Sequence, residues 1–542
     1  MRPFRISVKC RRSVLLSASL IASVFLACEA SPARAGGTLR IAMTAADVPT
    51  TTGMPNNGFE GMRFLGYPIF EGLILWDLTR SDVPAGLRPG LAEKWVQDKA
   101  DPTRWTFTLR RGVKFHDGSD FNADAVVWNL ERFFNSQAKQ FETQGAGISR
   151  ARNPWLKAWR KIDDFTVEMS TNRPVSYFPY VVVYLLIASP AQFDKTGSWA
   201  EVAKAPAGTG PFKITEVKPR VSVELSRNAA YWDRTKIAKL DKIVLFPMPE
   251  STTRLAALRS GQVDWIEVPP PDAVPSLKQA GFEIVTGVYP HVWPWVFNMA
   301  RPDSPWRDVK VRQAANYCVD RDGLVKLLNG LAYPSVGFFP KTNPAFGKPK
   351  NVYAFDPAKA RALLKEAGFH PDRPVKAKIM ISTSGSGQML PLPMNEFLQQ
   401  SMRPCGFDIT FEVVEWGAML VALRNPPTAQ QSLNSDAMNI SLVSSDASRM
   451  AGLFLGSSLP PNGTNWGNWK NETFDGAFAR IERSSDPREI DEQLRRAHEQ
   501  LVDDPPWLWI VHDGNPRAMT KHVKGFANAQ SWFQDLTLID MN

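Results

Sequence analysis

The middle of the chain alternates strand-type with helix-type segments, and this alternation constrains the fold more than any other feature. Segment 242–248, KIVLFPM, is short, apolar and rich in branched residues, which is typical of a buried strand. Segment 253–267 then has a helical pattern that Gly261 closes, and a strand at 375–382 is again followed by a helix at 390–403. Strands that alternate with helices predict parallel sheets covered by helices, an α/β architecture.

The first 35 residues have the composition of an export signal. Basic residues open the segment, an apolar run extends from Val14 to Ala27, and residues 33–35, Ala-Arg-Ala, fit a cleavage site. We therefore expect residues 1–35 to be a signal peptide and the mature chain to begin near Gly36.

The export route has three alternatives. The pair Arg11 and Arg12 fits a twin-arginine signal, and the general secretory route stays open beside it. Lipidation at Cys28 is less expected, because Phe25 stands three places before it.

Removal of the signal changes the charge and the cysteine count. Six basic residues and one acidic residue leave, so 64 Lys and Arg fall to 58 and 54 Asp and Glu fall to 53. The mature chain has no basic stripe with interleaved aromatic residues, so no nucleic-acid partner is expected. Cys318 and Cys405 remain and could form a disulfide outside the cytoplasm. The apolar run 180–188 is too short for a membrane span.

Residues 114–124, KFHDGSDFNAD, concentrate residue types that occur in active sites. His116 and Asp117 are adjacent at the end of an expected strand, so their side chains should diverge. Asp117 and Gly118 form a turn dipeptide, and Asn122 can cap a helix that begins at 123. We expect a strand, a turn and a capped helix; a secreted hydrolase that uses His116, Asp117 or Asp120 is the alternative.

Enzyme and metal signatures are absent from the rest of the sequence. It contains no Walker loop, no H-E-x-x-H, no G-x-S-x-G and no C-x-x-C, and its six histidines are scattered. We therefore expect no catalytic residue, no bound metal and no cofactor.

Several segments, in order, resemble the bacterial extracellular solute-binding proteins of family 5, which include the dipeptide-, oligopeptide- and nickel-binding proteins of ABC importers. The resemblance runs from about Gly37 to the C-terminus. It is carried by YPIFEGLILWD, PGLAEKWVQDKADPTRWTFTLRRGVKFHDGSDFNADAVVWNLER, GTGPFKITEV, ALRSGQVDW, FNMARPDSPWRDVKVRQAANYCVDRDGLVKLLNG and FDPAKARALLKEAGF.

The resemblance implies a type II periplasmic binding protein clamp of the large cluster C type, with an extra small domain. Lobe I would comprise residues 36–77, 196–290 and 506–542, the accessory domain II residues 78–195, and lobe III residues 291–505. Two hinge strands would join the lobes, one in VYPHVWPWVFN and one in DDPPWLWIVHD. A solute would lie between the lobes, and closure would bury it.

The resemblance also suggests ligand-binding residues. Peptide-binding relatives place an aspartate against the ligand's α-amino group, and that motif falls on Asp446, which could equally cap a loop. Trp416 matches a tryptophan beside a side-chain pocket, or it is a core residue at a strand end. Trp293, Trp295 and Trp509 lie in the hinges, where they contact the ligand or pack between the lobes.

One departure from the family concerns the cargo. Peptide-binding relatives often carry Gly-Trp and an arginine just before the anchoring aspartate, whereas this chain has Ile440, Leu442 and Val443. The missing arginine leaves room for a peptide, another amine, an opine, a glutathione-like molecule, an aromatic compound or a metal chelate.

We therefore expect a monomeric periplasmic solute receptor that delivers its cargo to an ABC permease and ATPase. A secreted hydrolase, or the same fold used for signalling or chaperoning, are the alternatives.

Overall fold

The computed structural model describes residues 36–56, 58–385, 387–461 and 463–542. The expected signal peptide, the twin-arginine pair and the lipidation site at Cys28 lie outside the described residues.

Lobe I is built on a seven-stranded mixed sheet. Its strand order is β10-β11-β12-β1-β13-β22-β14. The strands are β1 (Thr38–Met43), β10 (Phe212–Lys218), β11 (Ser222–Arg227), β12 (Lys242–Pro247), β13 (Trp265–Glu267), β14 (Glu283–Val285) and β22 (Arg517–Met519). Only β1 pairs in parallel, with β12 and with β13. The expectation of parallel sheets is therefore met in the centre alone, because the β10–β11 hairpin and the last strands pair antiparallel.

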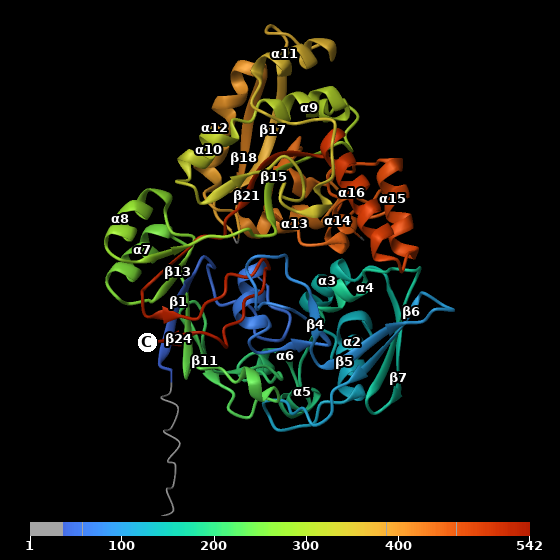
Figure 1. The fold of residues 1–542 in the computed structure, drawn as a ribbon, viewed down its shortest axis with the longest axis vertical. Helices are drawn as coiled ribbons and strands as arrows, with labels where there is room; N and C mark the ends of the chain where they lie inside the picture. Colours follow the sequence, from blue (N-terminus) through green and yellow to red (C-terminus); the bar gives the residue numbers. More distant parts are fainter. Residues whose placement is uncertain (1–35, 57, 386, 462) are drawn as a thin grey trace, which may run out of the picture. The chain divides into compact units, whose positions relative to one another are not determined.

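Lobe III is built on a second mixed sheet, of order β16-β21-β15-β19-β17-β18 with β20 on β15. The strands are β15 (His291–Phe297), β16 (Ala332–Pro334), β17 (Val375–Ser382), β18 (Phe407–Val414), β19 (Ala437–Asn439), β20 (Leu442–Val443) and β21 (Trp507–Asp513). β17 lies parallel to β18 and β19, and Figure 1 shows α12 (Pro391–Met402) beside these strands. β15 and β21 are buried along their whole length, which explains their continuous apolar sequences.

Domain II contains an antiparallel sheet of order β5-β6-β8-β7. Its strands are β5 (Ala92–Gln97), β6 (Arg104–Leu109), β7 (Leu156–Asp163) and β8 (Thr166–Thr171). Trp105, Phe107 and Leu109 of β6 alternate with threonines and are buried on one face of the sheet. α2 (Ala123–Phe134) packs on this sheet, and α3 (Thr143–Arg152) packs on α2.

The remaining elements are short strand pairs and helices. The pairs are β2 (Glu71–Gly72) with β9 (Leu186–Ile187), β3 (Ile74–Trp76) with β4 (Leu87–Pro89), and β23 (Val523–Lys524) with β24 (Asp540–Met541). The helices are α1 (Gly58–Gly61), α4 (Phe178–Val182), α5 (Pro190–Thr196), α6 (Trp199–Val202), α7 (Ser251–Arg259), α8 (Val274–Gln279), α9 (Val309–Tyr317), α10 (Arg321–Leu327), α11 (Pro357–Glu366), α13 (Trp416–Arg424), α14 (Ala447–Phe454), α15 (Glu472–Arg483) and α16 (Pro487–Asp503).

The chain crosses between the two large sheets at two places. Residues 286–290 lead from β14 to β15, and residues 514–516 lead from β21 to β22. Residues 283–300 thus contain two strands, β14 and β15, that belong to different sheets. β21 pairs with β15 and β16 in lobe III, so the chain returns to lobe I after Asp513 rather than at residue 506.

The disulfide forms between Cys318 and Cys405 and ties the end of α9 to the loop before β18. Residues 308–329 contain two helices, α9 and α10, rather than one. The break follows from Asp320, whose side chain accepts a hydrogen bond from Gly323 N and caps α10.

A buried ion cluster lies beside the crossings. Glu267 of β13 receives hydrogen bonds from Arg63 and, at 3.0 Å, from Nε of Arg517. Trp265 Nε1 also donates to Glu267, and all of these side chains are buried. Burial alone would raise the pKa of Glu267, but the two arginine charges outweigh it and lower the pKa.

Candidate binding cavity

A cavity of about 460 Å³ lies between helices of domain II and lobe III. The helix α13 contributes Trp416, Gly417, Leu420, Leu423 and Arg424, and α3 contributes Gln144, Gly147, Ile148, Ala151 and Arg152. Each set follows the helical repeat, so each helix presents one face to the cavity. Two helices from separate parts of the chain therefore form opposite walls.

The rest of the lining comes from loops and strand ends of both lobes. Lobe I supplies Pro55, Asn56 and Trp532, whereas lobe III supplies His291, the segment 440–442, Arg449 and Thr464. His291 opens β15, and segment 440–442 leads from β19 into β20. The cavity thus lies where lobe I, domain II and lobe III meet, beside the crossing into β15.

Three arginines give the cavity its charge. Arg152 ends α3, Arg424 ends α13 and Arg449 lies in the first turn of α14. None of the three makes an ion pair with a described carboxylate, and no Asp or Glu is among the described residues that line the cavity. Burial and, to a smaller extent, the charges of Arg449 and Arg424 lower the pKa of Arg152 to about 10, so Arg152 stays cationic at neutral pH.

The polar groups that line the cavity include donors without a partner. Trp416 Nε1 and Arg449 Nε are buried without a hydrogen-bond partner in the described part of the chain. His291 Nδ1 lies 2.8 Å from Ser441 Oγ, and burial lowers the pKa of His291 to about 3, so the ring is neutral. The lining therefore offers donors and positive charge to an occupant.

The Trp416 side chain packs against the backbone of Gly385. A Cβ added to Gly385 would lie 2.5 Å from Trp416 Cδ2, and Gly385 has a φ of +142°. The indole therefore packs flat on the loop after β17, and only glycine allows this approach.

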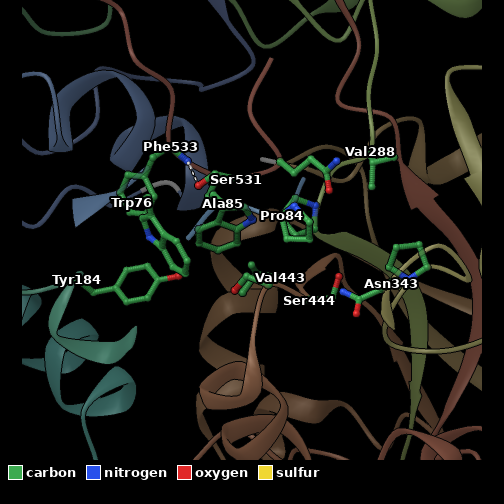
Figure 2. Close-up of a pocket in the computed structure, with 15 residues that line it drawn as sticks. Trp76, Pro84, Ala85, Tyr184, Val288, Asn343, Val443, Ser444, Ser531 and Phe533 are labelled. Carbon is green, nitrogen blue, oxygen red and sulfur yellow. Dashed lines mark hydrogen bonds between the residues drawn. The ribbon is translucent and has the colours of Figure 1, made fainter. Parts of the chain in front are cut away.

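A second, small cavity of about 30 Å³ lies beside the first and shares Trp532 with it. Figure 2 shows Trp76 and Tyr184 on one side of it and Val443, Ser444 and Asn343 on the other. It holds about one water molecule. Its lining joins both lobes, so it marks a place where they touch.

Asp446 lies at the N-terminus of α14. Its carboxylate accepts a hydrogen bond from Ser448 N at 2.8 Å and others from the hydroxyls of Ser445 and Ser448. The side chain is buried and lines neither cavity between the lobes. The cap fixes the first turn of α14, from which Arg449 reaches the cavity.

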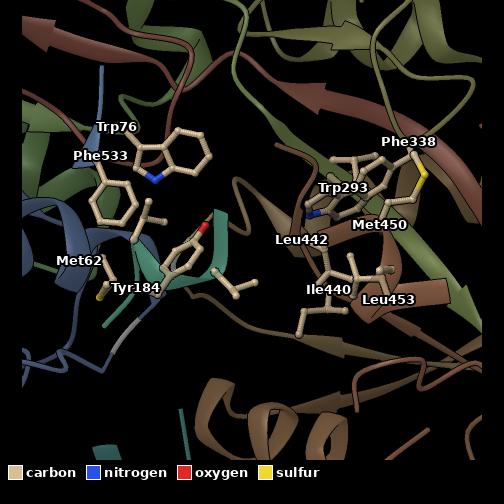
Figure 3. Close-up of a cluster of buried hydrophobic side chains, with 14 of the residues drawn as sticks. Met62, Trp76, Tyr184, Trp293, Phe338, Ile440, Leu442, Met450, Leu453 and Phe533 are labelled. Carbon is tan, nitrogen blue, oxygen red and sulfur yellow. The ribbon is translucent and has the colours of Figure 1, made fainter. Parts of the chain in front are cut away.

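The three hinge tryptophans lie inside lobe III. Trp293 Nε1 donates to Gln388 O, Trp295 Nε1 to Asn395 Oδ1 and Trp509 Nε1 to Leu501 O. All three are 0% exposed and line neither cavity between the lobes. Figure 3 shows Trp293 beside Phe338 and Met450. Among the sequence-predicted ligand residues, the structure brings only Trp416 to the cavity of about 460 Å³.

The side chains of residues 114–124 make separate contacts. His116 Nε2 lies 2.9 Å from Gly210 O, and burial lowers the pKa of His116 to about 4. Asp117 accepts from Ser119 N at 3.0 Å and from two serine hydroxyls, and Asp120 pairs with Lys114. Asn122 caps α2 by accepting from Ala125 N. The predicted turn and capped helix are confirmed. The predicted strand end is wrong, because β6 ends at Leu109 and Lys114 forms only an isolated bridge with Asp120.

A larger cavity, of about 700 Å³, lies on lobe III alone. It is lined by α11, the segment around Cys405 and the start of β18. Because all its walls belong to one lobe, closure of the lobes cannot enclose a solute there.

Sequence reasoning missed Arg152, Arg424 and Arg449. The sequence search for a ligand arginine covered the residues before Asp446, whereas Arg449 follows it by three positions. Glycine, alanine and isoleucine recur at helical spacing in α3, and this pattern could have indicated a helix face that lines a cavity. No local pattern links it to α13, more than two hundred and fifty residues later.

The described residues contain no group of three or more His, Cys, Asp or Glu that could hold a metal ion. Within the same residues, no helix combines the length and the apolar character needed to cross a membrane. Two mixed sheets, two crossings and a cavity between them define a two-lobed solute-binding protein.

The comparisons give the family. The sequence profile of the bacterial extracellular solute-binding proteins, family 5, matches residues 86–458. The chain therefore belongs to the bacterial extracellular solute-binding proteins of family 5.

Known relatives agree with this membership. The glutathione-binding protein GsiB of Salmonella choleraesuis is 28% identical over 433 residues, which are 79% of this chain and 81% of GsiB. The fold is similar to DppA of Helicobacter pylori in complex with the peptide STSA, with a TM-score of 0.78, 24% identity and coverage of 93% and 98% of the two chains. It is also similar to AgaA of A. tumefaciens R10 in complex with agropinic acid, with a TM-score of 0.75, 20% identity and the same coverage.

Proposed function

We propose that this chain is the periplasmic receptor of an ABC importer and captures a peptide or peptide-like small solute in the cavity between its lobes. It then delivers the solute to a membrane permease, and a partner ATPase supplies the energy. The receptor acts as a monomer and performs no chemistry of its own. Relatives named for glutathione, a peptide and agropinic acid support a small polar cargo.

The observation that carries this proposal is the empty space beside the cavity-facing surfaces of α3 and α13. A Cβ added to Gly147 of α3 or Gly417 of α13 would meet no atom within 4 Å. Both glycines line the cavity, and about 460 Å³ is the size of a small-molecule site. The volume thus suits a solute rather than packed side chains.

The test fills the cavity from one wall. Leucine at Gly417 extends into the open space, whereas leucine at Gly476, an exposed helical glycine of α15 with equally free surroundings, is the matched control. A thermal-shift screen over dipeptides, glutathione, opines and nickel chelates is run on the wild type and both variants.

We expect at least one solute to stabilise the wild type and Gly476→Leu but not Gly417→Leu. Stabilisation that persists in Gly417→Leu would place the solute elsewhere, and the lack of any stabilising solute would count against a receptor. Uptake of the solute in cells with and without the chain separates transport from signalling.

One of the sequence-predicted ligand residues, Trp416, receives a role under this proposal. Trp416 forms an apolar wall and offers its indole N–H to the solute. Asp446 as an anchor for a ligand ammonium group stays a prediction, since three hydrogen bonds already occupy much of its carboxylate. Trp293, Trp295 and Trp509 act on the solute only through the packing of lobe III.

A further inference from the structure

We infer that the cavity selects a solute with two or more carboxylate groups, bound by Arg152, Arg424 and Arg449. This inference rests on the proposed function, because it names the class of solute that the same cavity takes. The three arginines belong to three helices, and one of them belongs to domain II.

Buried arginines outside the cavity have partners. Arg132 pairs with Glu142, and Arg312 pairs with Asp504. Arg321 has no carboxylate but donates to the carbonyl oxygens of Ser335, Asn316, Tyr353 and Trp509. The buried guanidiniums in this fold thus have acceptors. The cavity arginines differ, since Arg152 and Arg449 are half-buried, Arg424 is exposed, and none of them forms an ion pair with a described carboxylate.

The cavity arginines lack such acceptors in the described part of the chain. Among the described residues, the guanidiniums of Arg152, Arg424 and Arg449 donate no hydrogen bond, and Arg449 Nε is buried without a partner. Desolvation and the like charges of the other two lower the pKa of Arg152. Cations that repel one another and have unused donors are stabilised by an anionic ligand.

Arg152 is held in place by aromatic rings rather than by charge. Its Cζ lies 4.3 Å from the ring centre of Tyr184 and 5.5 Å from that of Trp532. These contacts orient the guanidinium while its N–H groups stay available. A planar, oriented guanidinium suits the bidentate binding of a carboxylate.

The charge balance favours more than one carboxylate. Three arginines face the cavity, His291 is neutral, and no acidic side chain is among the described lining residues. A single carboxylate would leave two cations unneutralised. Leu420, Ile440, Leu442 and Trp416 line the space as well, so an organic solute with an apolar linker fits better than an inorganic anion.

The experiment compares solutes that differ by one charge. Calorimetric titrations use Ala-Glu against Ala-Gln, and glutathione against its monoethyl ester, with wild type, Arg449→Gln and Arg480→Gln. Arg480 is an exposed arginine of α15 without an ion pair among the described residues, so it controls for net charge.

We expect the dicarboxylate of at least one pair to bind the wild type and Arg480→Gln about tenfold or more tightly than its partner, since each charged pair contributes at least about 1.4 kcal/mol. In Arg449→Gln the dicarboxylate should lose most of that preference, while the partner's affinity changes little.

Equal binding within both pairs, a preference that survives in Arg449→Gln, or no binding of either dicarboxylate would overturn the inference. If a solute without a second carboxylate binds the wild type but not Gly417→Leu, the proposed function stands and only the charge selection fails. If no solute binding depends on Gly417, the proposed function itself fails.

Discussion

Two groups of arginines in this molecule have opposite surroundings. Arg63 and Arg517 share the carboxylate of Glu267 in the buried cluster beside the crossings. Arg152, Arg424 and Arg449 face the cavity without a described carboxylate. Both groups join segments that are far apart in the chain.

The difference separates scaffold from binding surface. A buried ion pair with its partners in place fixes the elements that carry it, and it is satisfied without a ligand. Unpaired cations beside a cavity are satisfied only when something else supplies the anion. We therefore expect changes in the first group to alter stability and changes in the second to alter binding.

The largest effect should follow from Glu267→Gln. This variant leaves Arg63 and Arg517 close together without their shared carboxylate, and loss of one partner of a buried pair typically costs about 3 to 5 kcal/mol. Chemical denaturation measures the change in the free energy of unfolding. Glu216→Gln, which removes an exposed partner of Lys218, is the control and should have a much smaller effect. Similar losses in the two variants would contradict a scaffold role for the cluster.

Asp513, next to the second crossing, should make stability depend on pH. Burial raises its pKa to about 7, and Asn515 N donates to it at 2.7 Å. Between about pH 4 and pH 7 the folded state therefore holds a proton that the unfolded state has lost, so this residue's contribution falls as pH rises, by up to about 1.4 kcal/mol per pH unit.

Asp513→Asn removes that contribution. The stability of the variant relative to the wild type should rise from pH 5 to pH 8, as measured by urea unfolding at each pH. His291 and His512 have the opposite effect on the pH dependence of stability, because burial lowers their pKa values to about 3 and 4. Both histidines are present in the variant and in the wild type, so most of their effect cancels when the two stabilities are compared. A difference that stays constant with pH would contradict the raised pKa.

Asp446 distinguishes a helix cap from a ligand anchor. Asparagine caps a helix about as well as aspartate, whereas alanine lowers stability by about 1 kcal/mol. We expect Asp446→Ala to lower the melting temperature and Asp446→Asn to leave it nearly unchanged. If Asp446→Asn also keeps the affinity for an amine-bearing solute, Asp446 is a cap alone; a marked loss would establish the anchor.

The smallest effect should be that of Arg449→Gln on the protein without solute. Loss of an unpaired cation removes repulsion from Arg152, so stability should change by less than about 0.5 kcal/mol or increase. Thermal unfolding without solute measures this. A loss as large as that of Glu267→Gln would mean that Arg449 belongs to the scaffold.

Much of the fold could be predicted because local patterns encode it. The alternation in β6, the Asn122 cap of α2 and the helix α12 were recognisable from spacing and end signals alone. The break between α9 and α10 and the placement of β21 in lobe III could not be predicted, since both depend on which distant strand or loop a segment meets.

The cavity was less predictable than the fold. Trp416 could be identified from its position after a strand, but Trp293, Trp295 and Trp509 have similar sequence surroundings and are buried in lobe III. What singles out Arg152 and Arg449 is the absence of a nearby carboxylate in three dimensions, and a single sequence does not contain that information.

The most direct test of the account is a crystal structure of the chain with a solute that stabilises it, chosen from the thermal-shift screen. We predict electron density between α3 and α13, against Trp416, with at least one carboxylate on Arg152 or Arg449. Density for the solute outside this cavity, or inside it with both guanidiniums turned away, would contradict the account.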